Sequence, residues 1–132
     1  MAKKTETTSA NYSVVIAETS KELSAKERIA MKDISNATKL DLACDGAKLV
    51  LAPADYAILS VHNEKSDNID YEVYVIMDKD GNKYSTGSES FWNAFKSIYD
   101  EMANENEPYE IEIYKLESKN YKGKFFLTCS IV

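Results

Sequence analysis

The chain has 132 residues, of which 44% are hydrophobic and 29% charged, the size and balance of one globular domain with a single core. Its formal net charge of −6 disfavours nucleic acids and anionic membranes as partners, so any phosphate-binding surface must be a local cluster of lysines. No apolar run approaches the ~20 residues that cross a bilayer, and the first residues lack the apolar stretch of a signal peptide, so we expect a cytoplasmic protein.

The first part of the chain predicts short elements. Residues 1–10 are polar and are expected to form a flexible arm. Ser24 and Glu27 have the spacing of a capping box, which predicts a short helix ending near Lys32. Alternating or β-branched runs predict strands at Tyr12–Ala17 (an edge strand), Lys39–Leu42 and Lys48–Leu51.

The middle of the chain predicts a run of antiparallel strands. Tyr71–Met77 is the strongest strand candidate because it is rich in β-branched and aromatic residues. Tyr56–His62 precedes it, and the turn at Asp78–Asn82 leads into a further strand, Lys83–Thr86.

The last part predicts one long helix and a terminal hairpin. Phe91, Phe95, Ile98 and Met102 lie on one helical face, which predicts a helix from about Ser88 to Ala103. Two strands follow, Tyr109–Tyr114 and Lys124–Ile131. The order of elements favours a mainly β fold, a five-stranded, partly open barrel with its helix before the last two strands. We expect a single domain, residues 1–132, with an N-terminal extension at 11–45 and the barrel at 46–132.

A basic loop is the clearest functional signal in the sequence. Residues 115–124 contain four lysines and one glutamate, in a chain that is acidic elsewhere. Tyr121 lies between Lys119 and Lys122, so the loop offers cations for phosphates and a ring on which a base can stack. The alternative, a solvated hairpin tip without a binding role, remains open. Lys115 begins the basic run and belongs to the same candidate site.

Tyrosines on strands form a second candidate feature. The chain has nine tyrosines and one tryptophan. Tyr74 lies on the opposite strand face from Val73 and Val75, and if those two are buried, its ring is expected to be exposed for base stacking. Packing between strands is an equally good explanation for any one tyrosine.

The residues Tyr74–Thr86, the following helix and the segment Tyr109–Ile131 resemble phage single-stranded DNA-binding proteins of the protein-primed replication type. The shared pattern is an aspartate–glycine hairpin, a helix, and a terminal hairpin with the sequence Ser-Lys-Asn-Tyr-Lys-Gly-Lys-Phe-Phe at 118–126. The resemblance covers about residues 46–132. It implies an OB-type fold that coats displaced DNA strands without sequence preference. By the same resemblance, the DNA contacts fall on Tyr84, Lys119, Tyr121, Lys122, Lys124 and Phe126.

Catalytic and metal-binding patterns are weak. His62 is the single histidine and has no nucleophile that the sequence pairs with it, and no glycine-rich phosphate loop occurs. Asp78–Asn82 matches part of a calcium loop, but Lys83 stands where glycine is required. Cys44 and Cys129 are expected to be buried free thiols.

We therefore expect a non-catalytic protein without cofactor or metal that binds single-stranded DNA in phage replication or recombination. Homo-oligomerisation stays open. The alternative function is an acidic protein-interaction module, an adaptor or inhibitor, whose basic loop is only a turn.

Overall fold

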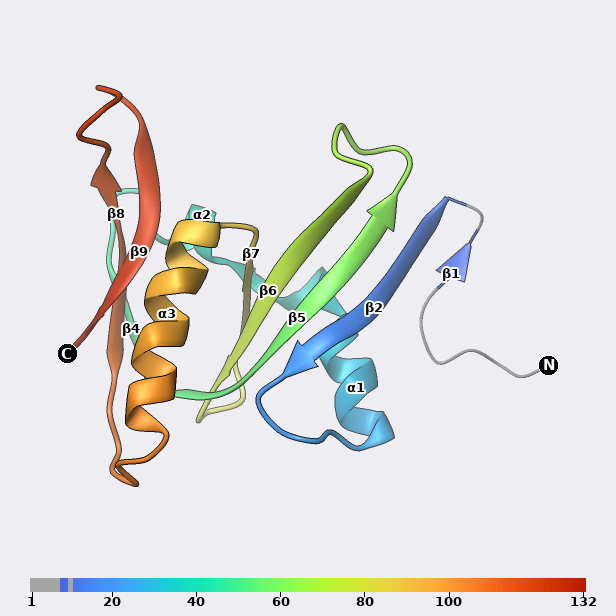
Figure 1. Cartoon of the computed structure of the whole chain (residues 1–132), viewed down its shortest axis with the longest axis horizontal. Coiled ribbons are helices and arrows are strands. Elements are labelled where there is room, and N and C mark those ends of the chain that lie inside the picture. Colours follow the sequence, from blue (N-terminus) through green and yellow to red (C-terminus); the bar gives the residue numbers. More distant parts are fainter. Residues whose placement is uncertain (1–7, 10) are drawn as a thin grey trace.

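The computed structural model describes residues 8–9 and 11–132, and in this part of the chain the strands form two separate sheets (Figure 1). In spatial order, the six-stranded sheet contains β1 (Thr8–Ser9), β2 (Tyr12–Thr19), β5 (Pro53–Asn63), β6 (Asp70–Asp78), β7 (Lys83–Thr86) and β3 (Thr38–Lys39). The three-stranded sheet contains β4 (Leu49–Leu51), β8 (Ile111–Glu117) and β9 (Phe125–Ile131). All neighbouring strands are antiparallel except β3 and β7.

Local sequence explains where the helices begin. Ser24 caps α1 (Ala25–Lys32) in a complete capping box with Glu27, and the Ser88 hydroxyl accepts a hydrogen bond from the Phe91 backbone at the start of α3 (Glu89–Met102). A short 3-10 helix (Ile34–Asn36) and the four-residue α2 (Leu40–Ala43) lie between α1 and β4.

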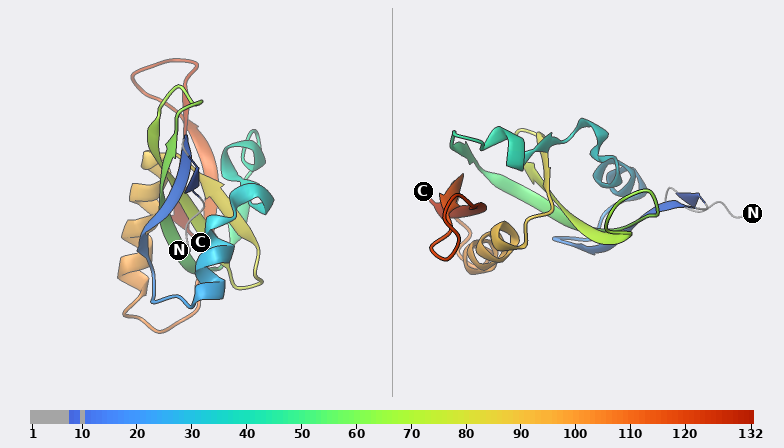
Figure 2. Two further views of the ribbon diagram at one scale, coloured as in Figure 1. Left: turned by 90° about the vertical axis from the view of Figure 1, so that its right-hand side faces the viewer. Right: turned by 90° about the horizontal axis from the view of Figure 1, so that it is seen from above.

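The long strands β5 and β6 are covered on both faces (Figure 2). Leu59 and Val75 pack on one face with Met31 of α1. Tyr56 and Tyr74 point to the other face, where they pack against α3. Because successive side chains of a strand alternate between faces, both sets of side chains become buried.

Helix α3 joins the two sheets through its apolar stripe. Phe91, Trp92 and Phe95 are buried and share one cluster with β5 and β6 of the large sheet and with Ile113 and Leu127 of the small sheet. The Ser90 hydroxyl donates a hydrogen bond of 2.8 Å to the Leu127 carbonyl of β9. The helix therefore fixes the terminal hairpin, formed by β8 and β9, against the rest of the protein.

Several expectations are confirmed. The chain is mainly β, the helix at 89–102 precedes the last two strands, and the capped helix after Ser24 is present. Cys44 and Cys129 are both buried and free, and burial raises the pKa of Cys129 to about 12.

Two expectations about architecture are wrong. The strands do not form one five-stranded barrel, because they divide between two sheets that are joined by α3 and do not close. Lys39–Leu42 is not a strand: Thr38 and Lys39 pair with β7, and the chain then turns into α2, which buries Leu40. Alternation over four residues is too short to distinguish a strand from one helical turn.

The N-terminal segment at 11–45 is an integral part of the large sheet. Strand β2 pairs with β5 from Tyr12 to Thr19, and Val14, Leu23 and Met31 belong to a buried cluster with β5 and β6. Of the arm expected at residues 1–10, Thr8 and Ser9 pair with β2, and the other residues lie outside those described. Among the described helices, none has the length and apolar character needed to span a membrane.

Candidate nucleic-acid interface

The predicted basic loop is the tip of the terminal hairpin. Strands β8 and β9 pair from Ile111 opposite Ile131 to Glu117 opposite Phe125, and residues 118–124 connect them. The Ser118 amide donates to the Lys124 carbonyl at 2.7 Å, and the Gly123 amide donates to the Glu117 carboxylate at 2.9 Å. Gly123 has φ of 82°, a conformation that favours glycine. Local hydrogen bonds and one glycine therefore define this turn.

The tip presents its cations and its ring to solvent. Tyr121 is 68% exposed, and the side chains of Lys119, Lys122 and Lys124 are exposed as well. Among the described residues, none forms an ion pair with these three lysines. The tip therefore combines three exposed lysines that form no ion pair in the described structure with an accessible aromatic ring, the combination expected from the sequence.

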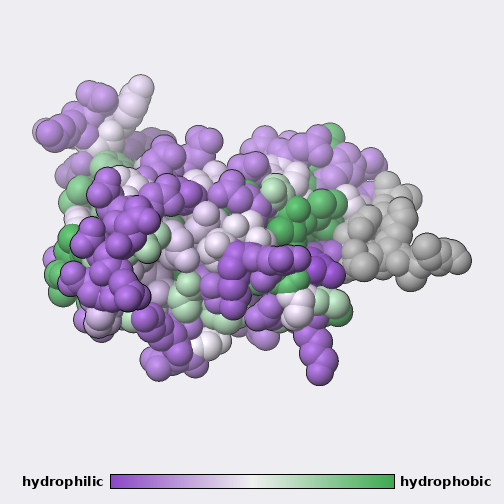
Figure 3. All heavy atoms as spheres, turned by 60° about the horizontal axis from the view of Figure 1, so that its bottom comes forward, coloured by the Kyte–Doolittle hydropathy of each residue, from purple (hydrophilic) through white to green (hydrophobic). Residues whose placement is uncertain are grey.

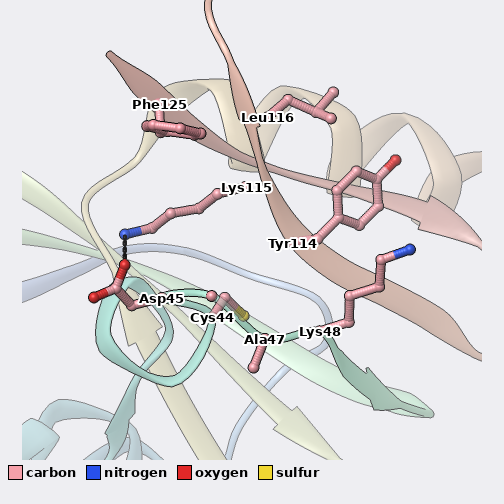
Figure 4. A pocket seen from close by; sticks show the side chains of 9 residues that line it. Cys44, Asp45, Ala47, Lys48, Tyr114, Lys115, Leu116 and Phe125 are labelled. Atoms are coloured by element: carbon pink, nitrogen blue, oxygen red, sulfur yellow. Dashed lines mark ion pairs between the residues drawn. The ribbon is translucent and has the colours of Figure 1, made fainter. Parts of the chain in front are cut away.

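Lys115 has a different environment from the lysines of the tip. Its ammonium group lies 4.0 Å from a carboxylate oxygen of Asp45, which is itself mostly exposed (Figure 4). Lys48, directly before β4, pairs with Glu112 at 3.4 Å and lies 5.3 Å from the centre of the Tyr114 ring. Both lysines are therefore partly neutralised by acidic neighbours.

A groove of about 550 Å³ lies between the turn at residues 44–48 and the hairpin. The groove forms because β8 has partners of different lengths on its two sides. Strand β4 pairs with β8 only from Ile111 to Ile113, whereas β9 pairs with β8 as far as Glu117. Residues 114–117 therefore project beyond β4. Figure 4 shows the side chains that line the groove: Cys44, Asp45, Ala47, Lys48, Tyr114, Lys115, Leu116 and Phe125.

Tyr74 is not available to a ligand, so the prediction that it is exposed is wrong. It is only 4% exposed and stacks on Trp92, with ring centres 4.8 Å apart. The prediction assumed that a sheet with one buried face leaves the other in water, but α3 covers the second face of β6.

Tyr84 lies on β7 of the large sheet, whereas the lysines lie on the hairpin of the small sheet. Its hydroxyl donates a hydrogen bond of 3.2 Å to Asp78, and its ring packs partly buried against the core. Burial, and secondarily the charge of Asp78, raises the pKa of Tyr84. A structural role in the turn after β6 accounts for these contacts.

The two phenylalanines of the hairpin point to opposite faces. Phe126, predicted to contact DNA, is 38% exposed and lies opposite Leu116, while Phe125 is 62% exposed and lines the groove. Phe125 is absent from the sequence-based prediction. The signal that could have identified it is the pair of adjacent phenylalanines at the start of a strand, because alternation places one ring on each face.

Other reactive groups are engaged in local structure. Asp78 accepts hydrogen bonds from the amides of Asp80 and Asn82 in the turn after β6. Burial opposes ionisation of Asp78, but these hydrogen bonds prevail and lower its pKa. Among the described residues, no group of three or more histidine, cysteine or acidic side chains is arranged to hold a metal ion.

Hydrophilic residues predominate on the face shown in Figure 3. Comparison with known proteins gives no relative: no protein-family model, curated protein or solved structure matches this chain. The candidate interface is thus defined by its own residues, the lysines and Tyr121 of the tip and the groove behind them.

Proposed function

We propose that this protein binds single-stranded DNA without sequence preference and that the tip of the β8–β9 hairpin is its main contact. The exposure of Tyr121 among lysines is the observation that carries this proposal. The Tyr121 side chain is 68% exposed, and the three lysines around it have no ion-pair partner in the described structure. The protein as a whole has a net charge of −6. Lysines held close together repel one another, and a bound polyanion relieves this repulsion.

An exposed ring favours a single strand over a duplex as the ligand. Bases in a duplex are already stacked on one another, whereas those of a single strand can stack on an aromatic side chain, which contributes about 1–3 kcal/mol per base. The flexible stems of the lysines can follow phosphates of any sequence. Both features agree with binding that does not depend on sequence.

The resemblance to phage single-strand binders extends the proposal to biology. It adds action in the cytoplasm and coating of strands displaced during replication or recombination. A mainly β chain with its helix before a terminal hairpin supports this extension. The activity requires no catalytic group, cofactor or metal.

A protein-interaction module is the second candidate. Leu116 and Phe126 expose apolar surface on one face of the hairpin, and Phe125 does so on the other. Such side chains also suit a protein partner. Salt distinguishes the two functions, because binding to a single strand weakens with a slope of about −0.7 per phosphate contact in a plot of log K against log salt.

The test reverses the charge of the tip. The variant Lys119→Glu, Lys122→Glu, Lys124→Glu is compared with Lys26→Glu, Lys65→Glu, Lys79→Glu, whose lysines are exposed, lie outside the hairpin and form no ion pair with a described residue. Each triple change takes the formal charge from −6 to −12, since each replaces three positive charges by three negative ones.

Anisotropy of a labelled oligo-dT measures affinity as a function of salt. We expect the tip variant to lose nearly all binding, and the control variant to keep most of it with an unchanged salt slope. Neutral substitution of the same three tip lysines by glutamine should reduce the slope by about 2. Equal losses in both charge-reversed variants, or equal affinity of the native protein for duplex DNA, would contradict the proposal.

A further inference from the structure

The groove behind the hairpin tip has the dimensions and lining of a small-ligand site. Its volume of about 550 Å³ lies within the range of about 300–1,000 Å³ typical of such sites. Phe125 and Leu116 both border the groove, and of the two only Phe125 lies on the strand face of Lys115. Lys48 and Lys115 supply cations (Figure 4). This combination suits a flat aromatic group that is attached to an anion.

Phe125 is the accessible ring of the groove. Its side chain is 62% exposed, and no stacking partner is recorded for it among the described rings. It lies on the same strand face as Leu127 and Cys129, which are buried further along β9. The ring thus stands where the core ends and the groove begins, and a stacked group would continue the core outwards.

Lys115 is held by a weak and replaceable partner. The Asp45 carboxylate is 79% exposed and lies 4.0 Å from the ammonium group, and a solvated pair of this kind contributes little to stability. A phosphate entering the groove can therefore take the place of Asp45 at small cost. Asp45 is then an anion that competes with the ligand for Lys115.

The groove is continuous with the proposed contact surface. Phe125 directly follows Lys124, and the amide of Lys124 bonds to the carbonyl of Tyr121 at 3.0 Å, so the tip and the groove are parts of one hairpin. A strand whose phosphates meet the lysines of the tip can pass along the hairpin into the groove. Phe126 points away from this path.

We propose that the groove binds one base of the single strand, that Phe125 is the ring on which this base stacks, and that Lys115 exchanges Asp45 for the adjoining phosphate. This inference rests on the proposed function and adds a second contact with DNA besides the hairpin tip. The contact lies on the opposite strand face from Phe126, the phenylalanine that the sequence predicted to bind DNA.

The experiment compares variants that remove the ring, restore it, or fill the groove. Phe125→Ala should weaken binding to oligo-dT by about 5- to 150-fold, the range that corresponds to the loss of one stacked base, and Phe125→Trp should restore it. Ala47→Trp should block the groove and weaken binding similarly without changing the tip. Ala17→Trp, at an exposed position on β2, is the matched control.

A further pair of variants tests the exchange at Lys115. Asp45→Asn and Asp67→Asn each remove one negative charge from an exposed position, but only the first frees Lys115. We expect Asp45→Asn to bind oligo-dT more tightly than Asp67→Asn. Circular dichroism melting accompanies every variant, so that a loss of binding is compared only between folded proteins.

The outcomes separate this inference from the proposed function. If the lysines of the tip are required but Phe125→Ala or Ala47→Trp binds like the native protein, the groove assignment fails and the proposed function stands. A larger loss from Phe126→Ala than from Phe125→Ala likewise overturns the assignment. If the native protein does not bind oligo-dT, the proposed function itself fails, and the inference fails with it.

Discussion

His62 lies between two carboxylates at the end of β5. Its Nδ1 is 2.7 Å from an oxygen of Asp70, and its Nε2 is 3.1 Å from an oxygen of Glu64. The hydrogen bond with Asp70, and then that with Glu64, raises the pKa of His62 above its ordinary 6.5. The protonated ring donates to both carboxylates, so the cluster joins the two strands of the β5–β6 hairpin when His62 is charged.

The charge of His62 makes a pH-dependent contribution to stability. The pKa of His62 is higher in the folded protein than in the unfolded chain, where it is about 6.5. The stabilisation is therefore complete below about pH 6.5 and is lost as the pH rises through the pKa of His62 in the folded protein. Near pH 5.5 we expect the free energy of unfolding of the native protein to be larger than that of the His62→Gln variant. At alkaline pH we expect this difference to disappear. Urea denaturation at several pH values measures it.

Nuclear magnetic resonance provides an independent check, since the chain has one histidine and therefore one ring to follow. Asp70→Asn should lower the pKa of that ring. A native pKa at or below 6.5 would show that the carboxylates do not act on His62 in solution.

At the level of elements, the hairpin tip depends on one backbone conformation. Gly123 has φ of 82°, and a Cβ added there would meet no atom within 4 Å. Any cost of Gly123→Ala is therefore backbone strain and not a steric clash. Gly87 provides the comparison, because its φ is not positive and an added Cβ would make an ordinary contact of 3.8 Å with the Glu72 carbonyl.

We expect Gly123→Ala to lower the free energy of unfolding by about 1–2 kcal/mol, the cost of a left-handed conformation for a residue with a Cβ. Gly87→Ala should leave stability unchanged or raise it by up to about 1 kcal/mol, because alanine has fewer conformations in the unfolded chain. Urea denaturation of both variants measures the difference. Equal effects would mean that the tip does not hold this conformation in solution.

At the level of the whole molecule, the two buried clusters share strands β5 and β6. Val75 packs with Met31 of α1 on one face, and its neighbour Tyr74 packs with Trp92 of α3 on the other. Loss of either cluster exposes one face of the same strands. The two clusters are therefore expected to unfold together, as a single cooperative unit.

Met31→Ala tests this coupling because Trp92, the single tryptophan, reports on the opposite cluster. Met31 is 2% exposed, so the substitution should cost about 2–5 kcal/mol. Tryptophan fluorescence and far-ultraviolet circular dichroism should shift to the same new denaturation midpoint. A fluorescence transition that stays at its native midpoint would show that the clusters unfold independently.

The elements whose signals are local could be predicted from the sequence. The apolar stripe from Phe91 to Met102 predicted α3, the capping box at Ser24 predicted α1, and alternation predicted the strands of the terminal hairpin. It also predicted an exposed basic tip around Tyr121, because neighbouring charges in a turn require no knowledge of the rest of the chain.

How these elements combine depends on contacts that the sequence pattern does not reveal. Tyr74 is buried because α3 covers the second face of β6, and the groove exists because β4 ends its pairing with β8 at Ile113. Burial and grooves depend on contacts between residues far apart in the chain, and the alternation of side chains does not specify what covers each face of a sheet.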